Sequence, residues 1–389
     1  MRVKPWILPG LLLAGGVTWN VWPAVAAILA LLLPAVVIQA DSRSTRWLFA
    51  FLWFLTGSVS LVPSVAGFFG SQYLVYGVAA WVVSSALLAL PWIIASTPAG
   101  AVMAVLLDAV PPIGLIGWLS PLTAAGWLFP GQGLAGVVGC LMVILWLTSM
   151  TSRNGKGFVS LATMVLTAWI LAIWSALANL VYIPPTTPAD WVGIQTSIPP
   201  GNGNVFQAIA NNRALIAAAQ LQSVHAKYLV FPEAVLDDWW PGTRSQIVAA
   251  VPQGQTWIVG AETLIPGARY DALVIAQHHR AWPNPVFRAV LPMPISMWRP
   301  GFAGSFQATW HEPVQIIDGQ RVWANICFDQ VLPWVWIDGM LQQPDLVLLS
   351  SNGWWAQPWN LALQIQKTEA MAWVRLEGKP AIFAQNTAY

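Results

Sequence analysis

Three polar residues with complementary chemistry, Cys327, Glu233 and Asn352, each follow a short apolar run that is typical of a buried strand. Residues at the carboxyl ends of strands gather at one edge of an α/β sheet, so we expect these three side chains to form one site. A cysteine is a good nucleophile only as its thiolate, and a nearby carboxylate can take its proton. The pattern therefore predicts thiol chemistry with Glu233 as the base.

The stretch Val322–Asp329 places Cys327 at a break between two patterns. A short strand pattern stops at the cysteine, and the amphipathic run 331–341 predicts a helix. A strand-to-helix turn can lift a nucleophile out of the sheet and aim backbone N–H groups at an oxyanion. Asp329 stands two residues further on. The alternative for Cys327 is a small buried hydrophobic residue, and for Glu233 a solvated loop residue.

Tryptophans follow the candidate site segments. Many of the chain's 26 tryptophans are expected at membrane interfaces, where their amphipathic rings are enriched. Those near the candidate site are Trp239, Trp298, Trp354 and Trp355. As an alternative to an interfacial role, we expect these four to form an apolar mouth that binds an acyl chain near the membrane surface.

The composition predicts a membrane protein with two different halves. Hydrophobic residues make up 57% of the chain and charged residues only 8%, against roughly 25% charged in soluble domains. Residues 1–182 hold only six of the 17 Lys/Arg and two of the 15 Asp/Glu. We therefore expect a transmembrane domain at 1–182 and a globular domain at 183–389. The net charge of +2 comes with no basic stripe, so direct binding to nucleic acid is not expected.

Seven apolar runs in the first half are candidates for membrane spans, and an α-helix needs roughly 17–25 residues to cross a bilayer. They lie at about 6–21, 23–40, 47–69, 73–95, 99–119, 122–150 and 158–182. With seven crossings the cationic pairs Arg2/Lys4, Arg43/Arg46 and Arg153/Lys156 all fall on one side, which the positive-inside rule assigns to the cytoplasm. Six spans would split these pairs between the two faces, so seven are favoured. The sequence thus predicts a multi-pass membrane protein with its C-terminal domain outside the cytoplasm; in a Gram-negative cell this is the inner membrane, with that domain in the periplasm.

The second half alternates short strand patterns, the first at 191–197, with helical ones, which predicts a layered α/β domain. Its histidines are not spaced as metal ligands, and no glycine-rich phosphate-binding loop occurs, so we expect no metal and no cofactor. The other cysteine, Cys140, lies in an apolar run of the first half. We therefore expect no disulfide, and Cys327 should carry a thiol.

The order of five short motifs resembles that of the nitrilase (carbon–nitrogen hydrolase) superfamily. The motifs are Phe-Pro-Glu233, Cys327-Phe-Asp, Asn352-Gly-Trp-Trp, Glu377-Gly-Lys-Pro and Asn386-Thr. The likeness is greatest to membrane-anchored members that serve plasmid conjugal transfer, as the segments 120–131 and 293–300 indicate, and the apolipoprotein N-acyltransferases are related. The resemblance implies several α-helical spans followed by an α-β-β-α sandwich. The sequence stops shortly after Asn386, where the family continues, so the expectation is either a trimmed sandwich or a truncated product.

The resemblance also implies roles for individual residues. Glu233 would be the general base, Cys327 the nucleophile that forms a thioester, and Asp329 and Asn352 supporting residues. The family's third catalytic residue is a lysine, but the segment 286–292 contains none, and Arg288 is the nearest cation at an offset of one residue. Arginine cannot relay a proton, although it can stabilise an oxyanion. A further acid of the family is also missing, because Pro-Met-Pro-Ile stands at 292–295.

These features predict Cys-dependent acyl transfer or amide hydrolysis in the service of conjugal transfer. Expected partners are membrane lipids, a phospholipid or small amide as acyl donor, and proteins of the conjugation apparatus. One alternative is a membrane scaffold of the mating apparatus without catalytic activity, which the missing lysine favours. A second alternative is apolipoprotein N-acyltransferase activity.

Overall fold

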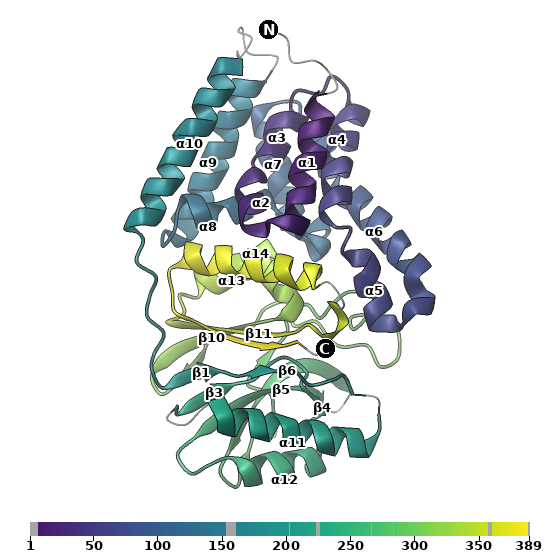
Figure 1. Cartoon of the computed structure of the whole chain (residues 1–389), viewed down its shortest axis with the longest axis vertical. Coiled ribbons are helices and arrows are strands. Elements are labelled where there is room, and N and C mark those ends of the chain that lie inside the picture. The colour runs from purple at the N-terminus through teal and green to yellow at the C-terminus, as the bar shows by residue number, and fades with distance from the viewer. Residues whose placement is uncertain are drawn as a thin grey trace. The chain divides into compact units, whose positions relative to one another are not determined.

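The computed structural model describes residues 7–152, 161–201, 203–222, 226–265, 267–282, 284–356 and 360–387 (Figure 1). The chain packs as two compact units. The helical unit comprises residues 1–184, 331–337 and 359–378, and the sheet unit comprises 185–330, 338–358 and 379–389. The cationic pairs Arg2/Lys4 and Arg153/Lys156, on which the predicted topology depends, lie outside the described residues.

The helical unit is built from apolar helices. They are α1 (Ile7–Val21), α2 (Pro23–Leu29), α3 (Leu32–Val37), α4 (Arg43–Gly57), α5 (Leu61–Phe69), α6 (Leu74–Leu88), α7 (Pro98–Ala109), α8 (Ala125–Leu128), α9 (Gly133–Thr151) and α10 (Leu161–Val181), with short 3-10 turns at Ser71–Tyr73, Pro91–Ile94, Ile113–Ile116 and Pro121–Ala124.

Among the described residues, two helical stretches are long and apolar enough to cross a membrane, Ser71–Ile94 and Gly133–Thr151. A third is possible if α4 and α5, which meet at a bend of 51°, form one span. Proline and glycine divide several of the predicted runs, because proline lacks a backbone N–H and breaks a helix. For example, α7 ends just before Pro111, and Gly131 with a φ of 76° separates α8 from α9. The prediction of seven spans is thus not confirmed.

One helix of the helical unit comes from near the C-terminus. This is α14 (Leu361–Glu377), whose buried face packs against the segment 119–136. The N–H of Leu119 donates to Glu369 Oε1 at 2.7 Å, and the N–H of Gly131 donates to the carbonyl of Arg375 at 2.7 Å. A Cβ on Gly126 would overlap the carbonyl oxygen of Ala372, so this close approach requires glycine. Residues far apart in sequence therefore build one packed body.

The sheet unit contains two sheets. Sheet A has the order β1 (Trp191–Gly193), β3 (Tyr228–Val230), β5 (Thr256–Ile265), β6 (Ala268–Gln277) and β7 (Arg280–Ala281), with β4 (Leu236–Asp238) on β5 and β8 (Phe287–Arg288) on β6. Sheet B has the order β2 (Gln195–Thr196), β12 (Ala381–Asn386), β11 (Leu346–Asn352), β10 (Gln320–Ile326) and β9 (Gln315–Ile317). The β10, β11 and β12 strands are parallel, so their carboxyl ends lie at one edge.

Two apolar cores hold the sheet unit together. One lies between sheet A and the helices α11 (Val205–Gln222) and α12 (Pro241–Ala250), and it includes Leu215 and Ile247. The other lies between the two sheets and includes Val230 of sheet A and Leu348 of sheet B. The predicted α/β architecture is thus confirmed for this region. The single strand predicted at 191–197 is divided, since β1 pairs in sheet A and β2 in sheet B.

Candidate active site

Cys327 stands where β10 ends and a 3-10 turn (Cys327–Val331) leads to helix α13 (Pro333–Leu341). Its φ is 48°, in the left-handed region. Such a backbone conformation costs on the order of 1–3 kcal/mol for a residue other than glycine, and it is common at functional sites. The chain turns sharply here, so the half-buried thiol is presented at the strand end, where Glu233 lies.

Glu233 follows β3 and is 4% exposed. Its carboxylate accepts hydrogen bonds from the Cys327 thiol and, at 3.0 Å, from the N–H of Asn352. Gly260 of β5 makes room for this segment, because a Cβ there would lie 2.6 Å from the Cα of Glu233. Two sheets therefore bring together the three residues that the sequence singled out.

The proton of this pair rests on the thiol. Burial raises the pKa of Cys327 well above its ordinary value, and the negative charge of Glu233 raises it further. Burial also raises the pKa of Glu233, whereas its hydrogen bonds to Cys327, Asp271 and Asn352 lower it. The resting state is thus a thiol that donates to a carboxylate, which is the arrangement needed for general-base activation.

Asn352 connects this pair to the rest of sheet B. Its Nδ2 donates to the carbonyl of Glu233 at 3.0 Å, and its Oδ1 accepts from Nδ2 of Asn386 at 2.8 Å. Asn386 Oδ1 in turn accepts from the Thr196 hydroxyl at 2.7 Å and from the N–H of Ile198 at 2.8 Å. Asn352 is therefore a positioning residue for Glu233, within a buried network that joins β11, β12 and β2.

Asp329 holds the backbone of a neighbouring segment in place. It is 1% exposed, and its two oxygens accept the N–H groups of Val290 and Leu291, each at 2.8 Å. Burial raises the pKa of its carboxyl to about 8, while the hydrogen bonds from Leu291 and Val290 lower it. This residue fixes the segment that follows Arg288 beside the turn of Cys327.

Arg288, predicted to replace the family's lysine, pairs with an acid. Its Nε lies 3.7 Å from Oε2 of Glu312, and its guanidinium lies 5.5 Å from the centre of the Tyr270 ring. The Glu312 side chain is 1% exposed and that of Arg288 is 36% exposed. Burial raises the pKa of Glu312 to about 8, and the charge of Arg288 opposes this rise.

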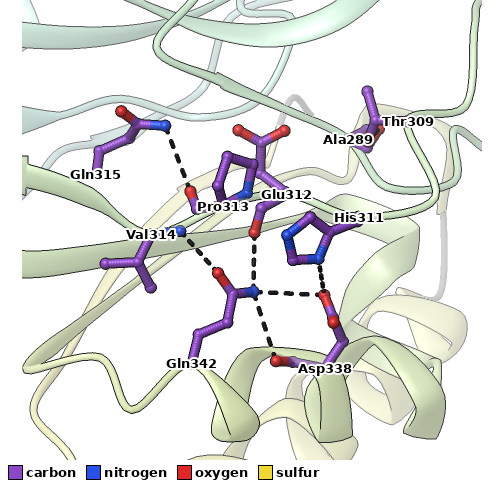
Figure 2. Close-up of polar contacts among 9 residues, drawn as sticks. All are labelled: Ala289, Thr309, His311, Glu312, Pro313, Val314, Gln315, Asp338 and Gln342. Carbon is purple, nitrogen blue, oxygen red and sulfur yellow. Dashed lines mark hydrogen bonds and ion pairs between the residues drawn. The ribbon is translucent and has the colours of Figure 1, made fainter.

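A short strap at 309–315 carries Glu312 (Figure 2). Gln342 holds the strap from both sides: its Oε1 accepts the N–H of Val314 at 2.9 Å, and its Nε2 donates to the carbonyl of Glu312 at 3.1 Å. The Thr309 hydroxyl donates to the carbonyl of Ala289 at 3.1 Å. In Figure 2 the Glu312 carboxylate points away from Gln342. The strap thus supplies an acid beside Arg288 that sequence reasoning missed.

Asp271 is the second acid that the sequence analysis missed. It lies on β6, is 2% exposed, and hydrogen-bonds with Glu233. A signal was present in the sequence. Successive strand residues point to opposite faces, so Asp271 shares a face with Leu273 and Ile275, which pack in the core between the sheets.

The four predicted tryptophans have different surroundings. Trp355 donates its Nε1–H to the carbonyl of Asn352 at 2.7 Å, and it lies with Trp354 in a partly exposed 3-10 turn. Trp298 packs edge-on against Trp310 with ring centres 5.6 Å apart. Trp239 is 6% exposed and belongs to the core between sheet A and its helices. Its position does not suit a substrate mouth, so we do not retain it in the site.

Comparison with known proteins supports the resemblance found in the sequence. No family model matches the chain. It is 28% identical to the “Probable conjugal transfer protein TraB” of Sinorhizobium fredii, over 97% of this chain and 96% of that protein. It is also 28% identical to the “Conjugal transfer protein TraB” of Agrobacterium fabrum, over 94% of this chain and 89% of that protein. The expected likeness to conjugal transfer proteins is confirmed.

Solved structures that resemble part of the chain include an amidase of the nitrilase superfamily and a carbon–nitrogen hydrolase. An amidase from Nesterenkonia AN1 is 14% identical with a TM-score of 0.32, covering 44% of this chain and 68% of that one. A carbon–nitrogen hydrolase from Helicobacter pylori is 12% identical with a TM-score of 0.30, covering 42% of this chain and 59% of that one.

Proposed function

We propose that this chain is an inner-membrane component of plasmid conjugal transfer that carries a cysteine-dependent acyl-transfer or amide-hydrolysis site. The observation that carries the proposal is the hydrogen bond between the Cys327 thiol and the buried Glu233 carboxylate, at a turn where Cys327 has a positive φ. The similarity to two conjugal transfer proteins over nearly the whole chain gives the cellular context.

The proposed reaction uses the two residues in two steps. Glu233 takes the thiol proton while the sulfur attacks the carbonyl carbon of the donor, and the carbonyl electron pair moves to oxygen. The leaving group then departs with the proton from Glu233, which leaves a thioester on Cys327. An amine or water attacks the thioester, gives its proton to Glu233, and the released thiolate takes that proton back. In this scheme Arg288 stabilises the negative oxygen by its charge.

The proposed donor is a membrane phospholipid or a small amide. Trp354 and Trp355 are partly exposed beside Asn352 and offer an apolar wall to an acyl chain. We place the protein in the inner membrane as a multi-pass protein with the sheet unit in the periplasm. Support for this location comes from the apolar helices of residues 7–181 and from the predicted distribution of cationic residues.

Labelling with an acyl donor tests the proposal directly. Membranes that contain the protein are incubated with an alkyne-tagged acyl phospholipid, and adducts sensitive to hydroxylamine are mapped by mass spectrometry. We expect a thioester on Cys327 that is lost in Cys327→Ala and strongly reduced in Glu233→Gln. Cys140→Ser is the matched control, because Cys140 is buried in the helical unit and should be dispensable.

A scaffold without catalysis is the second candidate. It is favoured by the absence of a lysine in 286–292 and by the pairing of Arg288 with Glu312. Mating assays separate the two functions: catalysis requires that Cys327→Ala reduces plasmid transfer, whereas a scaffold requires normal transfer by this variant. Absence of any adduct from lipid and small-amide donors, together with normal mating of Cys327→Ala, would refute the enzymatic proposal.

A further inference from the structure

We propose that Asp271 is a positioning residue that holds a proton of its own and donates it in a hydrogen bond to Glu233, so that the two buried carboxyls share one negative charge facing Cys327. This inference rests on the proposed role of Glu233 as the base. It adds Asp271 to the residues of the site and defines the charge state in which the site works.

The backbone brings the two carboxyls together. In the β5–β6 pair, Gly260 lies opposite Leu273, and Glu262 lies opposite Asp271. The segment of Glu233 crosses closely over Gly260, where a Cβ would overlap the carbonyl oxygen of Pro232. Asp271 is two residues from Leu273 and therefore projects from the same face of the sheet. Its carboxyl forms a hydrogen bond with that of Glu233.

A hydrogen bond between two carboxyls needs one proton, and the surroundings decide which group keeps it. Glu233 accepts hydrogen bonds from the N–H of Asn352 at 3.0 Å and from the Cys327 thiol. These donors stabilise its negative charge. Within the described residues, Asp271 Oδ1 is buried without a hydrogen-bond partner. A buried charged oxygen without a donor is costly, and a neutral carboxyl is less so. The proton therefore belongs on Asp271.

The other charged groups around Asp271 favour the same state. Besides Glu233, the acids Glu262 on β5 and Asp329 after β10 act on it, and both raise its pKa. The cation on the adjoining strand β8 is Arg288, next to Ala272 in register, and it pairs with Glu312. Several carboxyl groups thus surround Asp271. The nearby cation Arg288 pairs with Glu312.

In this proposal the proton between the two carboxyls remains on Asp271 throughout the reaction. At rest, neutral Asp271 donates to the Glu233 carboxylate, which accepts from the thiol. When sulfur bonds to the donor carbon, the thiol proton moves to Glu233, and both carboxyls are then neutral. When the bond to the leaving group breaks, the proton of Glu233 leaves with that group. Asp271 gives up no proton in either step, so its function is to orient Glu233 and keep it anionic at lower pH.

Alkylation of Cys327 tests this without any acyl donor. The full-length protein in a Cys140→Ser background is treated with iodoacetamide at a series of pH values at which it stays folded. The rate of Cys327 modification is followed by mass spectrometry. In the parent protein we expect a rise in rate with the ionisation of Glu233, and Glu233→Gln should abolish this rise.

Two substitutions of Asp271 separate its hydrogen bond from its packing. Asp271→Asn keeps an N–H donor for Glu233, so the midpoint of the pH profile should stay near that of the parent. Asp271→Ala removes the donor, so the midpoint should move upward by about one pH unit or more, the size expected for a hydrogen bond to a charged acceptor. An unmoved midpoint in Asp271→Ala, or an equal upward shift in Asp271→Asn, would overturn the proposal.

Infrared difference spectra provide a second measurement in case Asp271→Ala does not fold. At neutral pH, the spectrum of the parent minus that of Asp271→Asn should contain the C=O stretch of a protonated carboxyl, and its absence would also overturn the proposal. Failure of acyl labelling combined with the expected pH profile would count against the proposed reaction and leave the role of Asp271 intact. The two ideas can thus fail separately.

Discussion

Sheet A supplies two carboxyl groups and a guanidinium to the site, whereas sheet B supplies a thiol and an amide at the ends of parallel strands. Glu233, Asp271 and Arg288 come from sheet A or the segments that follow its strands. Cys327 and Asn352 come from the carboxyl ends of β10 and β11. Cys327 is placed by its backbone turn and Asn352 by a buried hydrogen-bond network, whereas the groups of sheet A are placed by hydrogen bonds and charge.

This difference has a practical meaning for substitutions. The Cys327 turn depends on a positive φ, and Asn352 depends on a buried network, so changes there should disturb structure as well as chemistry. The charge of the acids of sheet A depends on pH. Substitution of these side chains should therefore alter proton transfer, while the backbone pairing of the strands is kept. Three predictions, in order of decreasing effect, test this division of roles.

The largest effect is expected for Glu233→Gln. The amide keeps an oxygen that can accept the N–H of Asn352, but it cannot take the thiol proton. We expect the rate of Cys327 acylation to fall by about 10²–10⁴-fold, the usual contribution of a general base, with little change in thermal stability. A rate within tenfold of the parent, measured by single-turnover labelling, would remove Glu233 from the role of base.

A smaller effect, mainly on stability, is expected for Asn352→Ala. This change removes the hydrogen bond to the carbonyl of Glu233 and one of the two acceptors of Asn386 Nδ2, which still donates to the carbonyl of Ile198. The loss should be about 1–3 kcal/mol, because the groups left behind are buried. Thermal unfolding measures it, with Asn352→Asp as the control that keeps the acceptor for Asn386. Equal stability of the alanine variant and the parent would contradict this account.

The smallest effect is expected for Arg288→Gln, and it should depend on pH. Because burial raises the pKa of Glu312 to about 8 from an ordinary 4.5, the folded protein binds the extra proton between these values. Stability linked to Glu312 is therefore fully present at low pH and is lost as pH rises through about 8. Without Arg288 the ionised Glu312 is less favourable, so the variant should match the parent in acid and be less stable in alkali.

The difference in alkali should be no more than about 1 kcal/mol, because the Arg288 side chain is partly exposed and solvent screens its charge. Melting curves on both sides of the Glu312 titration measure it. Glu312→Gln is the matched control, since it removes the titrating group and should flatten this part of the pH dependence. A constant difference between Arg288→Gln and the parent at all pH values would show that packing, and not the charge pair, is lost.

The position of Cys327, Glu233 and Asn352 at strand ends predicted their grouping, but they come from two packed sheets and not from one sheet edge. Strand ends alone could not identify Asp271, which lies within a strand and requires the face of each residue to be considered. Glu312 stands in an irregular strap whose position depends on Gln342, and no local pattern encodes such a contact.

The failures elsewhere also have physical causes. Trp239 looked like a site residue because it follows Glu233 closely, but its ring packs on the helix side of sheet A. The strand predicted at 191–197 joins two sheets, a choice made by tertiary pairing and not by apolar content. Hydropathy identified the apolar region of the first half, whereas proline and glycine divided its helices in ways that hydropathy alone does not register.

The packing of α14 within the helical unit has a consequence for synthesis in the cell. The hydrogen bond between Leu119 and Glu369 joins residues 250 positions apart. At about 5–20 residues per second, the ribosome needs on the order of 10–50 s to make the chain between them. During that interval the segment 119–136 lacks the helix that covers it, so the packing of the helical unit is completed only after α14 has been made.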